Sequence, residues 1–359
     1  MKRTKRILLV AFIVLATVLS GCSREPASLC EVRMAPPGAQ LTTVNVGSMY
    51  IPEAATLQVA ASKGGYLERQ GLRANTTFVQ GGGAALPLLQ TGKLDVAIMN
   101  YVTALQHEAA RPDELKFLAD AYQAGKNTFK LMVRKDSPLR TPADLRGKTV
   151  AVVTLESIGT LSTEYVLAEY GLTKNDVTMT AVPLQKMTER LERSRTAPDA
   201  EPIDAAWMTE PFITSYASQF GGRTLVDVMD SALDSFPIAG WATTKTWASK
   251  HTDLLTRFQI AMSCAQSAVD GNRALVTKAL LGYIPKLDAK TAESITLGTF
   301  PLSLSRNRLQ RVADQMQERN YLRRSLDVCS MLLPMPALTP TPEASPSPST
   351  TNSHQECAP

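Results

Sequence analysis

The chain has 359 residues, of which 44% are hydrophobic and 20% charged, as is usual for a protein that folds around buried cores. Its length exceeds what one core usually organises, so two lobes are expected. Four of the basic residues (Lys2, Arg3, Lys5 and Arg6) stand at the N-terminus, and without them 34 basic residues face 33 acidic ones. This balance lacks the basic surface of a nucleic-acid-binding protein, so no nucleic acid is expected as a partner.

The N-terminus has the pattern of an export signal. The apolar run from Ile7 to Leu19 is too short for a membrane-spanning helix and typical of a signal peptide. Leu19-Ser20-Gly21-Cys22 then resembles a bacterial lipobox, in which the chain is cut before the cysteine and the cysteine is lipidated. We therefore expect residues 1–21 to be a lipoprotein signal peptide and Cys22 to anchor the protein to the membrane, outside the cytoplasm. A plain secretory cleavage is the alternative.

Both ends of the mature chain have the composition of irregular segments. Residues 22–40 are polar and contain prolines, which predicts a tether between the membrane and the folded part. Residues 334–359 are rich in Pro, Ser and Thr, which predicts a disordered tail.

Four cysteines remain besides Cys22, and outside the cytoplasm an even number suggests disulfides. Cys264 and Cys329 both lie in the helical C-terminal portion, whereas Cys30 and Cys357 lie in the expected tether and tail. We therefore predict a Cys264–Cys329 disulfide. Buried free thiols are the alternative.

The first part of the chain, residues 41–136, reads as an α/β lobe. A strand at 42–46 leads into a helix that begins at Pro52 and Glu53, with proline in its favoured first turn. A strand that ends near Phe78, a glycine turn, a helix at 84–90 and a strand at 94–99 then form a βαβ unit. The parallel strands of such a unit imply a doubly wound sheet covered on both faces.

The glycine turn, Gly81-Gly82-Gly83, stands at the carboxyl end of a strand, which is where doubly wound sheets bind ligands. Glycines there let the N–H groups of the helix start approach an anion. A tight turn without a ligand is the alternative.

A second α/β unit is predicted for residues 137–235, beginning at Ser137-Pro138, with strands at 149–153, 177–182, 203–207 and 224–228. A last strand at 238–243 and four helices follow. We therefore expect residues 236–333 to return to the first lobe.

Several phrases of this chain resemble those of extracytoplasmic solute-binding proteins of ABC transporters, in particular the group that binds sulfonates, taurine, nitrate or thiamine-pyrimidine precursors. These phrases are Gly64-Gly65-Tyr66 through Gly71-Leu72, Gly82-Gly83 followed by residues 89–97, residues 144–151, and Asp204-Ala205-Ala206-Trp207 with Glu210-Pro211. Together they cover roughly residues 42–330.

The resemblance implies a two-lobed periplasmic-binding-protein type II fold with a double crossover between the lobes. It further implies a monomer that captures a small-molecule solute between its lobes and delivers it to an ABC permease with its ATPase, without a cofactor. Enzymes of thiamine-pyrimidine and menaquinone-type metabolism share this fold, and a ligand sensor is a further alternative. Against catalysis, the three histidines show no spacing with cysteines or acids that would form a zinc site or a Cys/His pair.

In such a fold the loops at the strand exits line the cleft. The predicted ligand-binding residues are Ser48, Tyr50, Gly82, Gly83, Asn100 and Tyr101 on the first lobe, Thr154, Ser157, Gly159, Thr160, Trp207 and Glu210 on the second, and Trp241 at the return. Most of them have an alternative role. Tyr50 and Trp241 suit core packing, Ser157 and Thr160 suit helix capping, and Asn100 suits a solvent-exposed position.

The charges in these loops bear on the ligand. None of the loops contains Lys or Arg, which disfavours nitrate and divalent anions. Glu156 and Glu210 could accept hydrogen bonds from an amino group, although Glu210 before Pro211 is also a good helix start. An organic ligand with an aromatic ring or an amino group is therefore as consistent with the sequence as a sulfonate.

Overall fold

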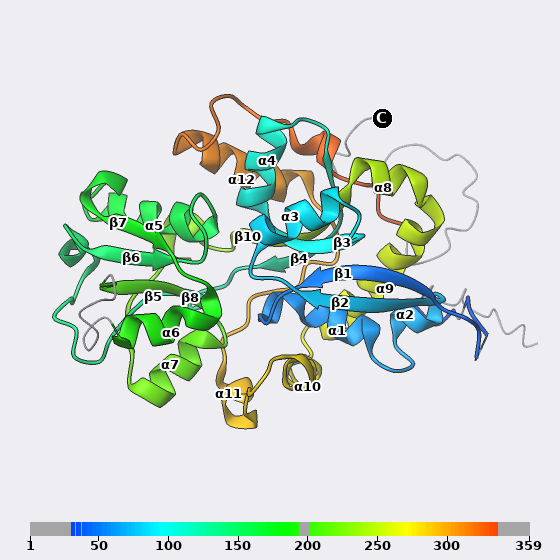
Figure 1. Cartoon of the computed structure of the whole chain (residues 1–359), viewed down its shortest axis with the longest axis horizontal. Coiled ribbons are helices and arrows are strands. Elements are labelled where there is room, and N and C mark those ends of the chain that lie inside the picture. Colours follow the sequence, from blue (N-terminus) through cyan, green and yellow to red (C-terminus); the bar gives the residue numbers. More distant parts are fainter. Residues whose placement is uncertain (1–29, 33, 37, 194–201, 337–359) are drawn as a thin grey trace, which may run out of the picture.

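The computed structural model describes residues 30–32, 34–36, 38–193 and 202–336. The predicted signal peptide, Cys22, Cys357 and most of the predicted tail lie outside these residues. The described chain forms two α/β lobes, each built on a five-stranded sheet (Figure 1).

The first lobe contains the sheet with strand order β2-β1-β3-β10-β4. Its strands are β1 (Thr42–Ser48), β2 (Leu72–Phe78), β3 (Val96–Asn100), β4 (Leu115–Gln123) and β10 (Pro237–Thr244). β1 runs parallel to β2 and β3, whereas β10 is antiparallel to both β3 and β4. The three parallel strands therefore end at one edge of the sheet, and their exit loops lie close together there.

The second lobe repeats this arrangement with strand order β7-β6-β8-β5-β9. Its strands are β5 (Phe129–Val133), β6 (Thr149–Val152), β7 (Thr178–Ala181), β8 (Ala205–Thr209) and β9 (Arg223–Asp227). β6 is parallel to β7 and β8, and β5 is antiparallel to β8 and β9. In each sheet the fourth strand is therefore the one that arrives from the other lobe.

The first crossing between the lobes comes earlier than predicted. β4 belongs to the first sheet and β5 to the second, so the chain crosses at residues 124–128 and not at 137. The apolar run of β5 does not reveal its sheet, because its partners β8 and β9 are more than 70 residues away in sequence. The chain returns at residues 228–236, which include the predicted return at 236.

These two hinge segments, residues 124–128 and 228–236, lie side by side. The Ala124 N–H donates to the Phe236 carbonyl (2.8 Å) at the first-lobe end, and the Val228 N–H donates to the Phe129 carbonyl (3.1 Å) at the second-lobe end. A third stretch joins them, because Gln123 and Thr299 exchange backbone hydrogen bonds of 3.0 Å. The chain therefore passes between the lobes through segments that lie next to one another.

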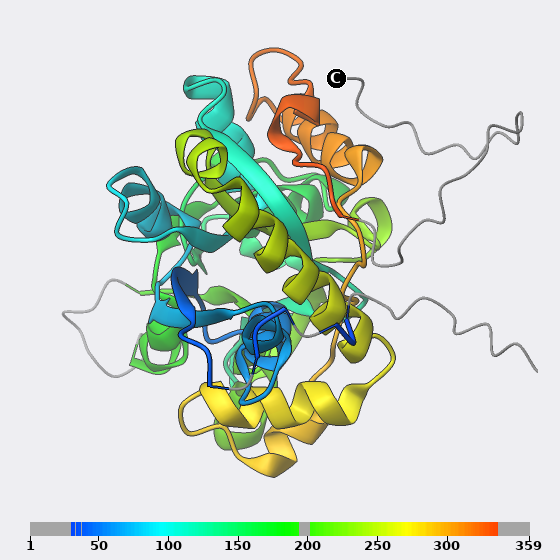
Figure 2. The same cartoon turned by 90° about the vertical axis from the view of Figure 1, so that its right-hand side faces the viewer.

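Helices cover both sheets. On the first lobe they are α1 (Ala55–Ala61), α2 (Tyr66–Arg69), α3 (Gly82–Gln90), α4 (Tyr101–Ala110), α8 (Lys245–Lys250), α9 (Thr252–Val269), α10 (Arg273–Tyr283), α11 (Ala289–Ser294) and α12 (Arg306–Glu318). On the second they are α5 (Ile158–Glu169), α6 (Leu184–Arg193) and α7 (Phe212–Phe220). Figure 2 shows the long helix α9 running across one face of the first sheet.

The end of α12 also reaches the second lobe. The Tyr321 hydroxyl donates to Glu164 of α5 (2.8 Å), and the Arg319 guanidinium lies 4.0 Å from the ring centre of Tyr165. The returning portion of the chain therefore contacts both lobes and not only the first.

The predicted Cys264–Cys329 disulfide is wrong. Cys264, buried in α9, is bonded to Cys30, with their Cα atoms 5.4 Å apart, and Cys329 is disulfide-bonded as well. The prediction failed because the second half of the predicted tether packs on the first lobe, where the Met34 N–H donates to the Arg69 carbonyl (2.8 Å). The location of Cys264 and Cys329 in the same part of the sequence therefore did not predict which cysteines form a disulfide.

The predicted tail likewise begins inside the fold. The Gln259 side chain donates to the Pro334 carbonyl (3.1 Å), and the Leu333 N–H donates to the Phe117 carbonyl (2.9 Å). No helix in the described ranges combines the length and the apolar character needed to cross a bilayer.

Candidate ligand-binding site

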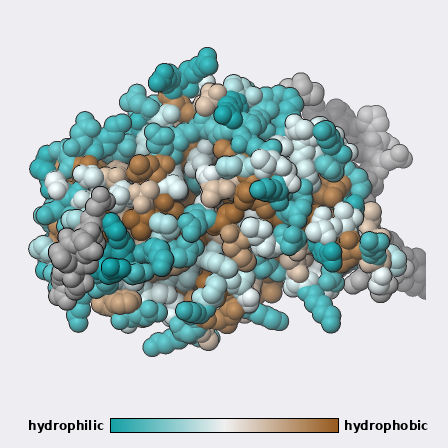
Figure 3. All heavy atoms as spheres, viewed as in Figure 1, coloured by the Kyte–Doolittle hydropathy of each residue, from teal (hydrophilic) through white to brown (hydrophobic). Residues whose placement is uncertain are grey.

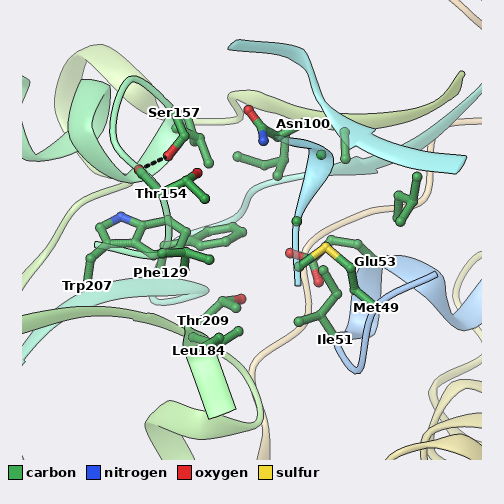
Figure 4. Close-up of a pocket in the computed structure, with 17 residues that line it drawn as sticks. Met49, Ile51, Glu53, Asn100, Phe129, Thr154, Ser157, Leu184, Trp207 and Thr209 are labelled. Atoms are coloured by element: carbon green, nitrogen blue, oxygen red, sulfur yellow. Dashed lines mark hydrogen bonds between the residues drawn. The ribbon is translucent and has the colours of Figure 1, made fainter. Parts of the chain in front are cut away.

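A cavity of about 60 Å³ lies between the two lobes, at the exits of the parallel strands (Figure 4). Figure 3 shows hydrophobic side chains interspersed with hydrophilic ones across the middle of this face of the molecule. The lining of the cavity consists of Met49, Ile51, Glu53, Gly81, Gly82, Ile98, Asn100, Ile238 and Ala239 from the first lobe side, and Phe129, Val153, Thr154, Ser157, Ile158, Leu184, Trp207 and Thr209 from the second. Most of these side chains are apolar, and a few polar groups stand among them, as is typical of a small-molecule site.

The second lobe contributes an aromatic wall. The rings of Trp207 and Phe129 stack with their centres 5.1 Å apart, and both residues are almost fully buried. The Trp207 indole N–H donates to Ser162 of α5 (2.9 Å), which fixes the ring orientation. A Cβ on Gly159 would lie 3.3 Å from the Trp207 ring, so glycine at this position allows α5 to pack closely on the indole. These contacts hold both rings in place within the second lobe.

The start of α5 uses its polar groups internally. The Ser157 N–H donates to the Thr160 hydroxyl (2.7 Å), and the Ser157 hydroxyl donates to the Thr154 carbonyl (2.7 Å; Figure 4). The capping role considered as the alternative for Ser157 and Thr160 is therefore present. Of these three residues, Ser157 and Thr154 line the cavity and Thr160 does not.

On the first lobe, Asn100 lines the cavity at the exit of β3 while it caps α4. Its side-chain oxygen accepts from the Thr103 N–H (2.9 Å), and its amide group donates to the Thr103 hydroxyl (3.0 Å). Beside it, Gly81 adopts a φ of +149°, which favours glycine. A Cβ on Gly81 would lie 3.9 Å from a methyl group of Thr154, so the two lobes approach each other at this rim.

Glu53 is the acidic residue in the lining. It lies in the short 3₁₀ turn Pro52–Ala54, is only 2% exposed, and its Oε2 accepts no hydrogen bond from any described residue. Figure 4 shows its carboxyl group directed toward the cavity from the first-lobe side. Burial raises the pKa of Glu53 from 4.5 to about 8, because an apolar environment disfavours the charged form. Glu53 is therefore held mainly as a neutral acid near pH 7 while the cavity is empty.

The structure brings five of the predicted ligand-binding residues together around the cavity, namely Gly82, Asn100, Thr154, Ser157 and Trp207. The other predicted residues do not line it: Ser48, Tyr50, Gly83, Tyr101, Gly159, Thr160, Glu210 and Trp241.

Two of the residues that do not line the cavity are core residues of the first lobe. Trp241 is fully buried in β10, opposite Ile98 of β3 and Ala119 of β4, because a central strand of a covered sheet has no exposed face. Tyr101 is 2% exposed and its hydroxyl donates to Asp120 (2.8 Å) inside the fold.

The others have structural neighbours outside the cavity. Tyr50 stacks on Phe78 at 3.9 Å, Ser48 is fully buried at the end of β1, and Gly83 is exposed on α3. None of these positions reaches the space between Trp207 and Glu53.

Glu210 connects the lobes instead of facing the cavity. Its carboxyl group accepts from the N–H (3.1 Å) and the hydroxyl (2.8 Å) of Thr214 on its own lobe, and from the Thr296 N–H (3.1 Å) beyond α11. Burial raises the pKa of Glu210, and these hydrogen bonds oppose that shift. The neighbouring residue Thr209 lines the cavity in its place.

Sequence reasoning did not single out Glu53, Phe129, Leu184 or Thr209 as ligand-binding residues. Glu53 was assigned only to the start of a helix, and acids at helix starts usually face solvent. Within the described ranges, no three His, Cys, Asp or Glu side chains come together as a metal site.

Two α/β lobes joined by a double crossover, with a cavity between their strand exits, define the class of periplasmic-binding-protein folds. The model of the NMT1-like family matches residues 38–281, and the chain belongs to this family.

Solved structures show the same fold. The chain is similar to the alkanesulfonate-binding protein SsuA from Xanthomonas axonopodis pv. citri, with 19% identity, a TM-score of 0.64, and coverage of 82% of this chain and 99% of that one. It is also similar to the periplasmic nitrate-binding protein NrtA from Synechocystis PCC 6803, with 16% identity, a TM-score of 0.63, and coverage of 80% and 84%. The desulfurization enzyme DszB matches with 16% identity, a TM-score of 0.58, and coverage of 82% and 96%. These likenesses confirm the predicted fold.

Proposed function

We propose that this protein is an extracytoplasmic solute-binding lipoprotein that captures a small solute between its lobes and delivers it to an ABC permease with its ATPase. The observation that carries the proposal is the cavity, because its walls come from the strand exits of both lobes. A solute that fills it makes its contacts only when the lobes are closed, so binding and closure are coupled. Sulfonates, nitrate and pyrimidine-like molecules are the solute classes to test first.

The composition of the lining supports binding over catalysis. Its described members contribute apolar surface, hydroxyl and amide groups and one carboxyl group, a set that orients a ligand. DszB shows that the fold also carries enzymes, and a ligand sensor would use the same cleft. A permease and an ATPase encoded beside this chain would favour uptake over sensing.

A solute screen on the purified protein tests capture. Sulfonates, nitrate, pyrimidines and amino acids would be added one at a time, and a solute that binds the folded state raises the melting temperature by mass action. Small-angle scattering with the same solutes should show a smaller radius of gyration, because the lobes close. A solute that raises the melting temperature without any contraction would contradict capture by lobe closure.

Trp207 offers an independent reporter, since it is one of three tryptophans and lies in the cavity wall. We expect a bound solute to change the tryptophan fluorescence in the wild type and in Trp247→Phe, but not in Trp207→Phe. Trp247 is the matched control because it lies on α8, away from the cavity lining. A signal that survives in Trp207→Phe would place the solute elsewhere.

The lipid anchor has its own test. Cys22→Ser removes the thiol that the lipobox would lipidate, so the variant should move from the membrane fraction to the soluble extracytoplasmic fraction. Cys357→Ser is the matched control and should leave the distribution unchanged. Membrane association of Cys22→Ser equal to that of the wild type would contradict the anchor.

A further inference from the structure

We infer that the solute is a small cation whose nitrogen-bound hydrogens bind the carboxylate of Glu53, and that it is not a sulfonate, nitrate or other oxyanion. This inference rests on the proposed function and names the class of its solute. It follows from what the cavity offers and from what its lining lacks.

The first observation is a buried acceptor that nothing satisfies. Glu53 is 2% exposed, and its Oε2 has no hydrogen-bond donor among the described residues. Buried carboxyl oxygens in native proteins normally accept hydrogen bonds, and an exception inside a cavity indicates a missing partner. An ammonium or amidinium group supplies both the donors and the compensating charge.

The second observation is that no positive side chain faces the acid. None of the described residues that line the cavity is Lys or Arg, and the groups around Glu53 are tyrosines. Burial and the charge of Glu53 both raise the pKa values of Tyr122 on β4 and Tyr283 on α10. Both hydroxyl groups therefore stay neutral at physiological pH. The remaining nearby acid is Glu210, which acts on Tyr122. An anion in the cavity would therefore meet the carboxyl group of Glu53, with no Lys or Arg in the described lining to offset it.

The third observation concerns the donors that an oxyanion would need. The Ser157 N–H, the Ser157 hydroxyl and the Asn100 amide group already donate to Thr160, Thr154 and Thr103. An oxyanion that used these donors would have to compete with their present partners, whereas a cation leaves the bonds intact.

The opposite wall suits a cation as well. Trp207 and Phe129 line this wall with stacked aromatic rings, which carry no positive charge that would repel a cation. The space of about 60 Å³ between the lobes suits a small solute. A compact, flat cation meets both conditions.

The test uses probes of matched shape and opposite charge. Acetamidinium and acetate have the same heavy-atom skeleton, and benzamidinium and benzoate form a larger aromatic pair. Binding would be measured by calorimetry on the purified protein at pH 6 and pH 8. We expect the amidinium probes to bind and the carboxylates to bind at least about tenfold more weakly at pH 8, because one charge pair is exchanged for a repulsion.

The direction in which the affinity changes with pH distinguishes a cationic solute from an anionic one without the use of any variant. Glu53, with a pKa of about 8, must ionise when a cation binds, so the affinity should rise with pH, up to about 50-fold between pH 6 and pH 8. Binding should also release close to one proton at pH 6, seen as a dependence of the binding enthalpy on the buffer. An anion would favour the protonated acid, so its affinity would fall as the pH rises, and its binding would take up protons near pH 8 and almost none at pH 6.

Variants locate the effect. Glu53→Gln keeps the shape of the side chain and should lower amidinium affinity at pH 8 at least about tenfold and abolish its pH dependence. Glu156→Gln is the matched control. Glu156 is an exposed acid in the loop between β6 and α5, and its side chain does not line the cavity. This substitution should leave the affinity unchanged.

Three results would each overturn the inference. Carboxylates could bind as tightly as amidines at pH 8, or the amidine affinity could be unchanged in Glu53→Gln. The third result is no amidine binding at concentrations of about 10 mM, where even weak ligands of this size should give a signal. If one of these occurs while a sulfonate or nitrate contracts the protein in scattering, the cation fails and solute capture stands. If amidines bind through Glu53 without contraction, capture by closure fails and the cation stands.

Discussion

Replacing Glu53 by glutamine should make the empty protein more stable at neutral and alkaline pH, and progressively less so as the pH falls. Burial raises the pKa of this carboxyl group from 4.5 to about 8. Between these two values the unfolded chain has already lost the proton while the folded chain keeps it. The unfolded state therefore binds fewer protons, and the free energy of unfolding falls as the pH rises through this window.

The size of the effect follows from the shift. With one pKa unit equal to 1.36 kcal/mol, the ionisable group destabilises the fold by about 1 kcal/mol at pH 5 and by about 4 kcal/mol at pH 8. Glutamine does not titrate, so the stability difference between the variant and the wild type should grow by about 3 kcal/mol across this range. For a domain of this size, that corresponds to a change in melting temperature on the order of 6 °C.

The assay is thermal unfolding of both proteins without solute, followed by circular dichroism at several pH values from 5 to 8. Only the difference between the two curves matters, because every other titrating group is common to both. Parallel melting temperatures across the whole range would refute the reasoning, since they would mean that Glu53 ionises in the folded state as readily as it does in water.

Three further predictions concern contacts that connect distant parts of the chain. Cys30→Ser removes the disulfide to Cys264, which joins residues 234 positions apart. The free energy of unfolding should therefore fall by up to about 5 kcal/mol. An unchanged midpoint of denaturant unfolding would contradict this. Glu210→Ala removes an acceptor of three hydrogen bonds and should lower the stability by about 2–3 kcal/mol, measured by denaturant titration, whereas a role limited to ligand contact would leave the midpoint unchanged. Tyr321→Phe removes the hydrogen bond to Glu164 between the lobes, so the closed form should lose about 1 kcal/mol and the radius of gyration without solute should increase. An identical scattering curve would show that this contact does not hold the lobes together.

The fold could be predicted from the sequence because its signals are local. The glycine turn at Gly81–Gly83 stands between strands β2 and β3, as expected for a βαβ unit. A strand followed by a turn at its carboxyl end places that turn at the edge of a parallel sheet whatever else the chain does. The same reasoning placed Gly82, Asn100 and Trp207 at the cavity.

The errors arose where the outcome depends on partners far away in sequence. Trp241 was expected near the ligand because its strand returns to the first lobe, but β10 pairs on both sides and both of its faces are covered. Phe129 was missed because β5 was assigned to the first lobe, where it could not meet Trp207. Cys30 was placed in a free tether, although it is bonded to α9.

Glu53 illustrates the same limit at the level of a single side chain. An acid just after Pro52 at a helix start is favourable in water, and nothing local distinguishes an exposed carboxyl group from a buried one. Its burial comes from elements that meet only in the folded protein, including Tyr122 of β4 and Tyr283 of α10. Local sequence patterns therefore could not predict the burial of Glu53, the residue on which the inferred class of solute depends.

The placement of these groups on different lobes connects recognition with closure. Glu53 lies on the first lobe and Trp207 on the second, so a solute that contacts both stabilises the closed form, and one that contacts only one of them does not. A ligand shifts a conformational equilibrium only by its difference in affinity for the two states. A contact between the solute and Glu53 that is shielded from water between the lobes is stronger than the same contact in bulk water. Glu53, which lowers the stability of the folded protein when the cavity is empty, is thus well placed to make closure of the lobes depend on the solute.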